Sequence, residues 1–531
     1  MSALLVALIS FLFFLEGYFF YAKFIEKVIG VNPHEATPAY KKYDGVDFIP
    51  AKNWLILFGH HFSSIAGAAP IVGPVIAISI WGWGPTLAWI ILGSIFIGAV
   101  HDFSSLVISI KNEGRSIADI TKDVISLRAK YIFSLFVFFA LILVVAVFSY
   151  LCAKTFVTDG RIIFPSLGLI PVAMFVGFLI YKIRFNQTLS TIIGLTLLGV
   201  LVYLSTQMSI TFNKDLLNIW IAILLLYAFF ASILPVNILL QPRDYLSAYL
   251  LFFGIIVGFL GVFISCPSVN APVFIKFNPQ KTFPLWPLLF VTVACGAVSG
   301  FHSLVASGTT SKQISNQKYA KRIGYGAMIF EAILATLALL CVSGGLNFSQ
   351  FKEIMKSSGP IVAFSKGFGI LTFPLLKQFG AIVGVIILNA FILTTLDTAT
   401  RITRYIFQEI TGIKNRWFST FVVIILAGFL AQGERWKLIW PTFGASNQLV
   451  AALALFVITL WLISKSKPYL PFLLSALFML ATTLGALFIQ LIKYFKEKEI
   501  LLFTVSLILI CLAIYLLWEV IRKMKELLSK K

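Results

Sequence analysis

Charged side chains are scarce in this sequence. Only 12% of its 531 residues are Asp, Glu, Lys or Arg, whereas 59% are hydrophobic. Soluble domains carry about 25% charged residues, which keep their surfaces hydrated. A chain of this length and composition cannot cover a soluble surface, so we predict an all-α polytopic membrane protein.

Cysteines, acidic residues and catalytic motifs are also few. The five cysteines lack the paired spacing of zinc, iron–sulfur or disulfide sites, and no nucleophile elbow, phosphate loop or HExxH motif occurs. We therefore expect no enzyme activity, no resident metal and no cofactor. Acidic residues number 21 against 42 basic ones, but the basic residues lie in short loops, where they set membrane topology. The charge excess therefore does not predict a nucleic-acid partner.

Long apolar runs are abundant. Runs of about 20 apolar residues can span a bilayer. The predicted inner loops hold about twice as many basic residues as the outer loops, which places the N-terminus outside and the C-terminus in the cytoplasm. Residues 347–376 are glycine-rich and short of apolar length, and we predict a re-entrant or interfacial outer segment there. About fifteen spans are predicted, near residues 2–22, 54–80, 86–110, 131–151, 162–181, 189–208, 216–240, 246–266, 284–306, 320–346, 377–400, 417–431, 438–463, 469–492 and 501–521.

One predicted span is interrupted by polar and helix-breaking residues. It covers residues 53–80 and reads NWLILFGHHFSSIAGAAPIVGPVIAISI. Gly67, Pro70, Gly73 and Pro74 disrupt the helical hydrogen-bond ladder at mid-membrane depth, where protein or a polar cavity must satisfy the freed backbone groups. Discontinuous helices of this kind form the substrate and ion sites of secondary transporters. We predict that the functional site is organised around this break.

A second interrupted segment follows residue 233. It reads LPVNILLQPRDYLSAYLLFFG and resembles the segment after the first break, PIVGPVIAISIWGWGPTLAWIILG. Corresponding interrupted segments predict an inverted repeat. The segment WPTFGASNQL places Asn447 and Gln448 in a span outside this repeat. We expect an extra N-terminal helix at 1–30, a cytoplasmic linker at 31–53, five-helix units at 54–208 and 216–411, and four accessory helices at 412–531.

Ionisable residues inside the predicted spans are candidate functional groups, because facing lipid costs each of them several kcal/mol. On one span Gly98, His101, Asp102 and Ser105 share a face that must point into the helix bundle. Either this face carries a coupling ion, or its polar groups form a hydrogen bond that packs two helices.

A second stripe of polar residues lies at the C-terminal end of the predicted span at 284–306. Ser299, His302 and Ser303 share a predicted helix face, and hydroxyl groups crowd residues 307–310. Oxygen atoms facing a broken helix could bind Na⁺, and a histidine beside them could titrate near neutral pH. Helix packing through small residues is the alternative.

Arginine–aspartate pairs are expected near the inner side. One stripe contains Thr394, Asp397, Arg401 and Arg404, in which Asp397 and Arg401 form an i,i+4 pair. The segment QPRDY places three further polar residues at the inner mouth: Gln241, Arg243 and Asp244. Each set either gates the inner side or anchors a helix at the membrane interface.

Several segments together resemble the signature segments of the carbon starvation protein A family of bacterial inner-membrane transporters. These are FGHHFSSIAGAAPIVGP, GAVHDF, LLQPRDY, ACGAVSGFHSLVASGTTSK, LTTLDTATR and WPTFGASNQLVAAL, in the family's order across residues 40–455. The resemblance implies uptake of peptides or of pyruvate with protons, and a leucine-transporter-like five-plus-five inverted repeat. The chain departs from the family at Gly67-Ala68-Ala69-Pro70 and at Thr310-Ser311-Lys312.

The resemblance also implies a set of site residues and a mechanism. Transport would proceed by alternating access, with half-helix ends binding a substrate carboxylate. The partners are then a small-molecule substrate, H⁺ or Na⁺ as the coupling ion, and membrane lipid. The substrate site would comprise Gly59, His60, His61, Ser63, Ser64, Gly67, Pro70, Asn237, Ser299, His302 and Ser303. Coupling would involve His101 and Asp102 for protons, or Ser307, Thr309 and Thr310 for Na⁺, and gating would involve Arg243, Asp244, Asp397 and Arg401.

Two other classes stay open at this point. A transition-metal transporter or metal-dependent membrane enzyme could use His60, His61, His101, Asp102 and His302 as ligands. A signalling receptor is the other, and net accumulation of substrate in proteoliposomes distinguishes it from a transporter.

Overall fold

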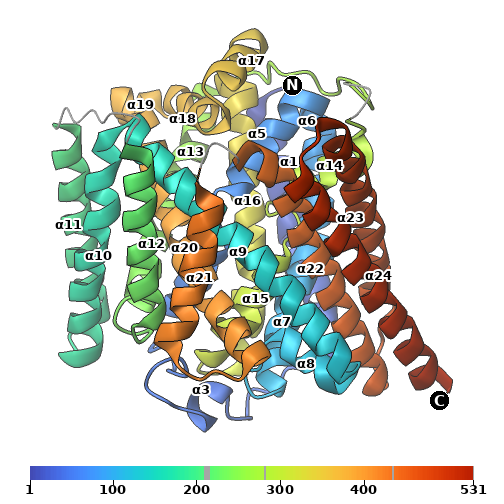
Figure 1. The fold of residues 1–531 in the computed structure, drawn as a ribbon. Coiled ribbons are helices and arrows are strands. Elements are labelled where there is room, and N and C mark those ends of the chain that lie inside the picture. Colours follow the sequence, from blue (N-terminus) through green and yellow to red (C-terminus); the bar gives the residue numbers. More distant parts are fainter. Residues whose placement is uncertain (208–215, 280–282, 433–435, 530–531) are drawn as a thin grey trace.

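The computed structural model describes residues 1–207, 216–279, 283–432 and 436–529 (Figure 1). These residues fold into helices; within them the only β pairing is an isolated bridge between Ser2 and Ser268. By length and composition, eleven helices of the described chain can cross a membrane, or twelve if a bent pair counts as one span. The protein is therefore a multi-pass membrane protein. The eleven, each with the labelled helices that it contains or forms part of, are Ala3–Ile29 (contains α1 and α2), Trp83–Lys111 (contains α6 and α7), Leu127–Thr158 (α9), Gly160–Lys182 (contains α10), Gln187–Thr206 (α11), Leu240–Ser265 (α13), Gln317–Gly345 (contains α16), Phe373–Thr411 (contains α19 and α20), Thr442–Ser464 (part of α22), Leu470–Glu497 (α23) and Leu502–Ser529 (part of α24).

The predicted count of about fifteen spans is not confirmed. Two apolar helices, α12 (Leu217–Ile233) and α21 (Arg416–Ala431), have 17 and 16 residues and are short for a span. The predicted span at 284–306 is not one continuous helix, because it consists of two helices, α14 (Leu285–Thr292) and α15 (Gly300–Gly308), separated by non-helical residues 293–299.

The predicted break in the first discontinuous helix is confirmed. α4 (Trp54–Ile65) and α5 (Ala69–Trp81) are bent by 41° at the break. Pro70 lies in the first turn of α5, where its missing N–H costs nothing. Gly67 lies in the break, and a Cβ there would stand 2.7 Å from the Phe148 ring and 2.9 Å from the Thr395 hydroxyl. The backbone therefore packs directly against α9 and α20 at the break.

The second break, at residues 293–299, lies against the first discontinuous helix. A Cβ at Gly73 of α5 would stand 2.5 Å from the carbonyl oxygen of Thr292, where α14 ends. A Cβ at Gly300, where α15 begins, would stand 2.2 Å from the carbonyl oxygen of Asn447 in α22 (Trp436–Ser464). Glycine at these positions lets three backbones approach closely. The two breaks are thus held together at the centre of the bundle.

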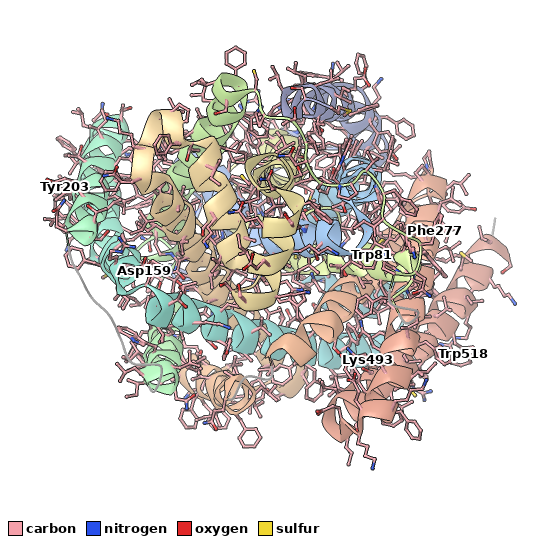
Figure 2. The ribbon with its side chains drawn as sticks, turned by 90° about the horizontal axis from the view of Figure 1, so that it is seen from above. Trp81, Asp159, Tyr203, Phe277, Lys493 and Trp518 are labelled. Atoms are coloured by element: carbon pink, nitrogen blue, oxygen red, sulfur yellow. The ribbon has the colours of Figure 1, made fainter. Side chains whose placement is uncertain are left out.

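Two long helices flank these breaks. α9 (Leu127–Thr158) and α20 (Gly380–Thr411) have 32 residues each and pack along one another. α5 packs on α16 (Gly326–Gly345), and α15 packs on α7 (Ala99–Lys111). The hairpin of α10 (Ile163–Gly177) and α11 (Gln187–Thr206) lies at one edge, and α23 with α24 (Ile500–Ser529) at the opposite edge, as Tyr203 and Trp518 mark in Figure 2.

The two ends of the chain lie on opposite faces (Figure 1). The N-terminus shares the upper face with α17 (Phe348–Ser357), α18 (Pro360–Leu371) and α19 (Phe373–Leu376). The C-terminal end shares the lower face with α3 (Pro38–Lys41) and α8 (Ile117–Val124). Residues 347–376, predicted as a re-entrant or interfacial segment, form these three short helices on the face that carries the N-terminus.

Candidate functional site

His60 of α4 is the meeting point of several buried polar groups. Its Nδ1 lies 2.7 Å from Oδ2 of Asp244 in α13 (Leu240–Ser265), and neither side chain is exposed. Its Nε2 lies 3.2 Å from the Thr309 hydroxyl and 3.3 Å from the Gln313 side-chain nitrogen. Ser63 donates a hydrogen bond of 2.9 Å to the backbone carbonyl of Asp244. His60 therefore ties α4 both to α13 and to the chain that follows α15.

Arg243 extends this cluster to α12 and α20. Its guanidinium donates to Asp244 at 2.6 Å and pairs with Asp397 of α20. Tyr227 of α12 donates to Asp397 at 2.6 Å. Buried ions are tolerated when they are paired and hydrogen-bonded. We call His60, Tyr227, Arg243, Asp244 and Asp397 the arginine network; it joins α4, α12, α13 and α20.

The predicted i,i+4 pair between Asp397 and Arg401 is wrong. Asp397 pairs with Arg243, whereas Arg401 donates to Asp47 of the linker at 2.7 Å, and Arg404 lies 3.3 Å from the same carboxylate. Burial alone would raise the pKa of Asp47, but the charges of Arg401, Arg404 and the nearby Lys312 lower it to about 2. The predicted linker is therefore packed against the bundle through an ionised carboxylate.

A second cluster joins two histidines and two carboxyl groups. His101 Nδ1 lies 2.8 Å from Asp102 Oδ1, and His302 Nδ1 lies 2.9 Å from Asp102 Oδ2. His302 Nε2 lies 3.2 Å from Glu331 of α16, but without hydrogen-bond alignment, so both Glu331 oxygens are buried without a partner. We call these four residues the histidine chain. An ionised carboxylate without a donor is costly in a low-dielectric interior, and no donor is aligned to either Glu331 oxygen.

Hydroxyl and amide side chains satisfy the backbone at both breaks. Thr394 of α20 donates to the carbonyl of Ser63 at 2.7 Å, and Thr395 donates to the carbonyl of Ser64 at 3.2 Å. Asn447 accepts a hydrogen bond of 2.8 Å from the amide of Phe301, in the first turn of α15. These partners explain how the unwound backbone is stable inside a membrane protein.

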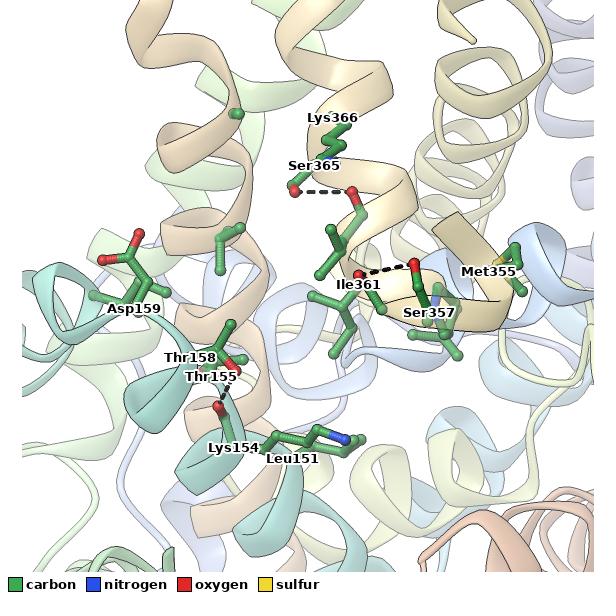
Figure 3. A pocket seen from close by; sticks show the side chains of 18 of the residues that line it. Leu151, Lys154, Thr155, Thr158, Asp159, Met355, Ser357, Ile361, Ser365 and Lys366 are labelled. Carbon is green, nitrogen blue, oxygen red and sulfur yellow. Dashed lines mark hydrogen bonds between the residues drawn. The ribbon is translucent and has the colours of Figure 1, made fainter. Parts of the chain in front are cut away.

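A cavity of about 540 Å³ lies between α5, α9, α18 and α20, under α17 on the upper face (Figure 3). Its lining includes Val72 and Ile76 of α5, Leu151 of α9 and Val385 of α20. The arginine network lies instead on the α4 side of the first break. The cavity thus lies on one side of the first break, and the arginine network lies on the other.

The described residues give no support to a single metal centre. In that part of the chain no group of three or more His, Cys, Asp or Glu residues is arranged to hold a metal ion. The five ligands considered from the sequence are divided: His60 belongs to the arginine network, His61 bonds to the Thr310 hydroxyl, and the other three, His101, Asp102 and His302, belong to the histidine chain.

Comparison with known proteins identifies the family. The family model described as carbon starvation protein CstA matches residues 2–363 and 347–486. The chain belongs to the CstA family. As a member of this family it is 31% identical to the peptide transporter CstA of Bacillus subtilis (strain 168), covering 86% of this chain and 85% of that protein. It is 30% identical to the pyruvate/proton symporter BtsT of Escherichia coli (strain K12), covering 94% of this chain and 83% of that protein.

Solved structures resemble the fold of this CstA-family chain at low sequence identity. The manganese transporter of Eremococcus coleocola, in complex with an aromatic bis-isothiourea substituted compound, superposes with a TM-score of 0.55 at 12% identity. The match covers 91% of this chain and 99% of that chain. The named relatives of the family are transporters, and the protein is therefore a transporter.

Most of the predicted site residues of this family member converge in two places. In the first, His60, Ser63, Ser64, Asp244 and Thr309 lie together, with His61 Nδ1 bonded to the Thr310 hydroxyl at 2.8 Å. In the second, His101, Asp102 and His302 lie together. Gly59 packs on α13, where a Cβ would stand 3.1 Å from the Cα of Tyr245. Their roles stay predictions.

Other predicted residues have different environments. Ser299 precedes α15 and does not share a helix face with His302; it accepts a hydrogen bond of 2.9 Å from Asn447. The Ser303 and Ser307 hydroxyls donate to carbonyls of their own helix. Asn237, predicted to face the first break, has a buried side-chain oxygen without a hydrogen-bond partner.

Several contributing residues were not assigned to the site from the sequence. The WPTFGASNQL and LTTLDTAT segments carried a usable signal, because amide and hydroxyl side chains are unusual at such density in a span. No such signal in the sequence marked Asp47, Tyr227 or Gln313, because each of them contacts a partner that is distant in sequence. The residues that sequence reasoning left out are Asp47, Tyr227, Gln313, Thr395 and Thr398, whose hydroxyl lies 3.0 Å from the Ser64 hydroxyl.

Proposed function

We propose that this protein takes up a small carboxylate-bearing nutrient, pyruvate or a short peptide, together with protons, by alternating access around the two helix breaks. The observation that carries the proposal is the juxtaposition of these breaks with the histidine chain. His302 lies in the first turn of α15, just past the second break, and its two ring nitrogens face Asp102 of α7 and Glu331 of α16. Helix N-termini at the breaks favour a substrate carboxylate.

Protons rather than Na⁺ are the coupling ion in this proposal. The histidine chain has buried groups that change charge when they bind a proton. One named relative is a pyruvate/proton symporter.

The inverted repeat is part of the proposal, with boundaries that differ from those expected from the sequence. We pair α4–α5 with α14–α15, α7 with α16, α9 with α20, α12 with α21, and α13 with α22. This pairing is supported by reciprocal packing, since α5 contacts α16 as α15 contacts α7. The hairpin of α10 and α11 is then an insertion in the first unit.

The arginine network would form the inner gate. We propose that the lower face of Figure 1 is cytoplasmic and that the membrane is the bacterial inner membrane, as the basic residues of the loops and the family suggest. Arg243, Asp244 and Asp397, with the Asp47–Arg401 pair, then close the path on the cytoplasmic side. The cavity on the upper face corresponds to an outward-facing arrangement.

Uptake by the purified protein in proteoliposomes tests the proposal. Pyruvate and alanyl-alanine are offered with either an inward proton gradient or an inward Na⁺ gradient. We expect accumulation of at least one of them, driven by the proton gradient. Accumulation that requires Na⁺ and ignores pH would contradict proton coupling, and no net accumulation of either compound would contradict the substrate class.

A further inference from the structure

The cavity on the upper face is lined by an excess of positive charge (Figure 3). Its cationic lining residues are Lys154, Arg161, Lys356 and Lys366, and the acidic residue among them is Asp159. Asp159 is already bound by Arg161, whose Nε and Nη2 lie 2.9 and 2.7 Å from its two oxygens. In the described part of the chain, Lys356 and Lys366 form no ion pair. The cavity therefore offers uncompensated cations to an incoming ligand.

The N-terminus of α18 adds to the positive electrostatic potential in the cavity. The first residues of α18, Pro360, Ile361 and Val362, line the cavity together with Gly359. No side chain caps this helix N-terminus, and the first amide groups of an α-helix have no acceptor within the helix. The N-terminal end of α18 and the lysine ammonium groups thus present positive charge to the same space.

The size and the apolar lining of the cavity restrict its ligand. About 540 Å³ lies within the range of about 300–1,000 Å³ typical of sites for drug-sized molecules, far more than a three-carbon acid requires. Ile76, Leu151, Ile382 and Val385 contribute apolar wall opposite the lysines of α17 and α18. A ligand that fills this space carries a carboxylate at one end and a longer, partly apolar body.

The floor of the cavity adjoins the first break. Val72 lies two residues after Pro70, and Leu151 lies one helical turn after Phe148. The Phe148 ring packs on Gly67 and meets the Phe443 ring at a centroid distance of 6.2 Å. The cavity floor at Leu151 is therefore one helical turn from Phe148, whose ring packs on the first break.

We propose that this cavity is a separate outer binding site, which captures a short peptide through its terminal carboxylate before the peptide reaches the helix breaks. Lys366, Lys356 and the N-terminal end of α18 bind the carboxylate, Lys154 extends the positive wall on α9, and the apolar wall accommodates the peptide body. The inference rests on the proposed function in one respect, namely that the substrate bears a carboxylate.

Thiol labelling of the full chain in proteoliposomes tests this site without requiring transport. Thr158→Cys places a thiol on the cavity wall, and its reaction is measured above the background of the native cysteines. A negatively charged methanethiosulfonate should react faster than a positively charged one, and Lys366→Gln should reduce that ratio. Lys352→Gln, on the outer side of α17 and outside the cavity lining, should leave it unchanged.

Ligand protection identifies the occupant. Alanyl-alanine should slow labelling of Thr158→Cys, its C-terminal amide should protect several-fold less, and Lys366→Gln should weaken the protection by alanyl-alanine. Equal protection by the peptide and its amide would overturn carboxylate recognition, and equal protection by pyruvate would overturn the peptide assignment. If wild-type proteoliposomes transport neither compound, the proposed function fails, while the labelling result still decides whether the cavity binds the peptide.

Discussion

The arginine network and the histidine chain are both buried and both built from charged residues, but they differ in how completely those residues are paired. In the arginine network, Arg243 contacts Asp244, Asp397 and Tyr227, and His60 bonds Asp244, so every charged side chain has a charged or hydrogen-bonded partner, although Oδ1 of Asp397 is itself unbonded. In the histidine chain, both oxygens of Glu331 and Nε2 of His101 are buried without a hydrogen-bond partner. Paired groups hold one arrangement of charge and fix helices relative to one another. Unpaired ones are costly in one charge state and are therefore suited to binding and releasing a proton.

This difference predicts that removing Arg243 has the largest effect on stability. Arg243→Gln leaves the carboxylates of Asp244 and Asp397 buried without their cation, which costs about 3–5 kcal/mol. We expect a large fall in the melting temperature in detergent and loss of all transport activity. The matched control is Arg115→Gln, whose side chain is 32% exposed and pairs with Asp119 and Asp123, and which should cost less than about 1 kcal/mol. Similar losses for the two variants would contradict the importance of the buried network.

The Asp47 pair predicts a smaller effect with a defined pH dependence. Because the folded-state pKa of Asp47 is lowered to about 2, its ionised form stabilises the protein at every pH above the unfolded value near 4, by about 2 kcal/mol. That stability is lost progressively as the pH falls from about 4 to the folded-state value of about 2. The difference in melting temperature between wild type and Asp47→Asn should therefore be constant from pH 8 to pH 5. A difference that disappears by pH 6 would show that Asp47 titrates there.

Asn447 tests whether the second break depends on its side-chain partner. Asn447→Ala leaves the amide of Phe301 without its acceptor, and an unsatisfied buried donor costs about 1–3 kcal/mol. We expect reduced transport together with a moderate loss of thermal stability. The control Gln408→Ala removes an exposed side-chain amide that donates to the carbonyl of Lys414 and should change neither transport nor stability. Wild-type transport and stability of Asn447→Ala would show that the second break does not depend on this side chain.

The first break could be predicted from the sequence, whereas the second could not. Gly67, Pro70, Gly73 and Pro74 interrupt a single short stretch, and proline cannot donate to the helical ladder. The second break contains no proline within residues 293–299, and it is stabilised by Asn447, which lies more than a hundred residues away. Local composition therefore predicted a continuous span there, and tertiary hydrogen bonds determined the outcome.

In the candidate site, too, some features could be predicted from the sequence and others could not. His101, Asp102 and His302 were recognised because ionisable residues are costly in a span and must face the protein interior. Their connection to Glu331, and the pairing of Arg243 with Asp397 rather than of Arg401 with Asp397, depend on how helices are placed relative to one another. Helical spacing predicts which residues share a face of one helix, but it carries no information on the facing helix.

Accumulation and counterflow, measured on the same proteoliposomes, test the central claim that the histidine chain carries the transported proton. Asp102→Asn and Glu331→Gln keep the shape of each side chain and remove its ability to change charge. Both variants should lose accumulation driven by a pH gradient and keep substrate counterflow, which requires no net proton movement, whereas Arg243→Gln should lose both. Undiminished pH-driven accumulation by both neutral variants, or a parallel loss of accumulation and counterflow, would contradict the claim.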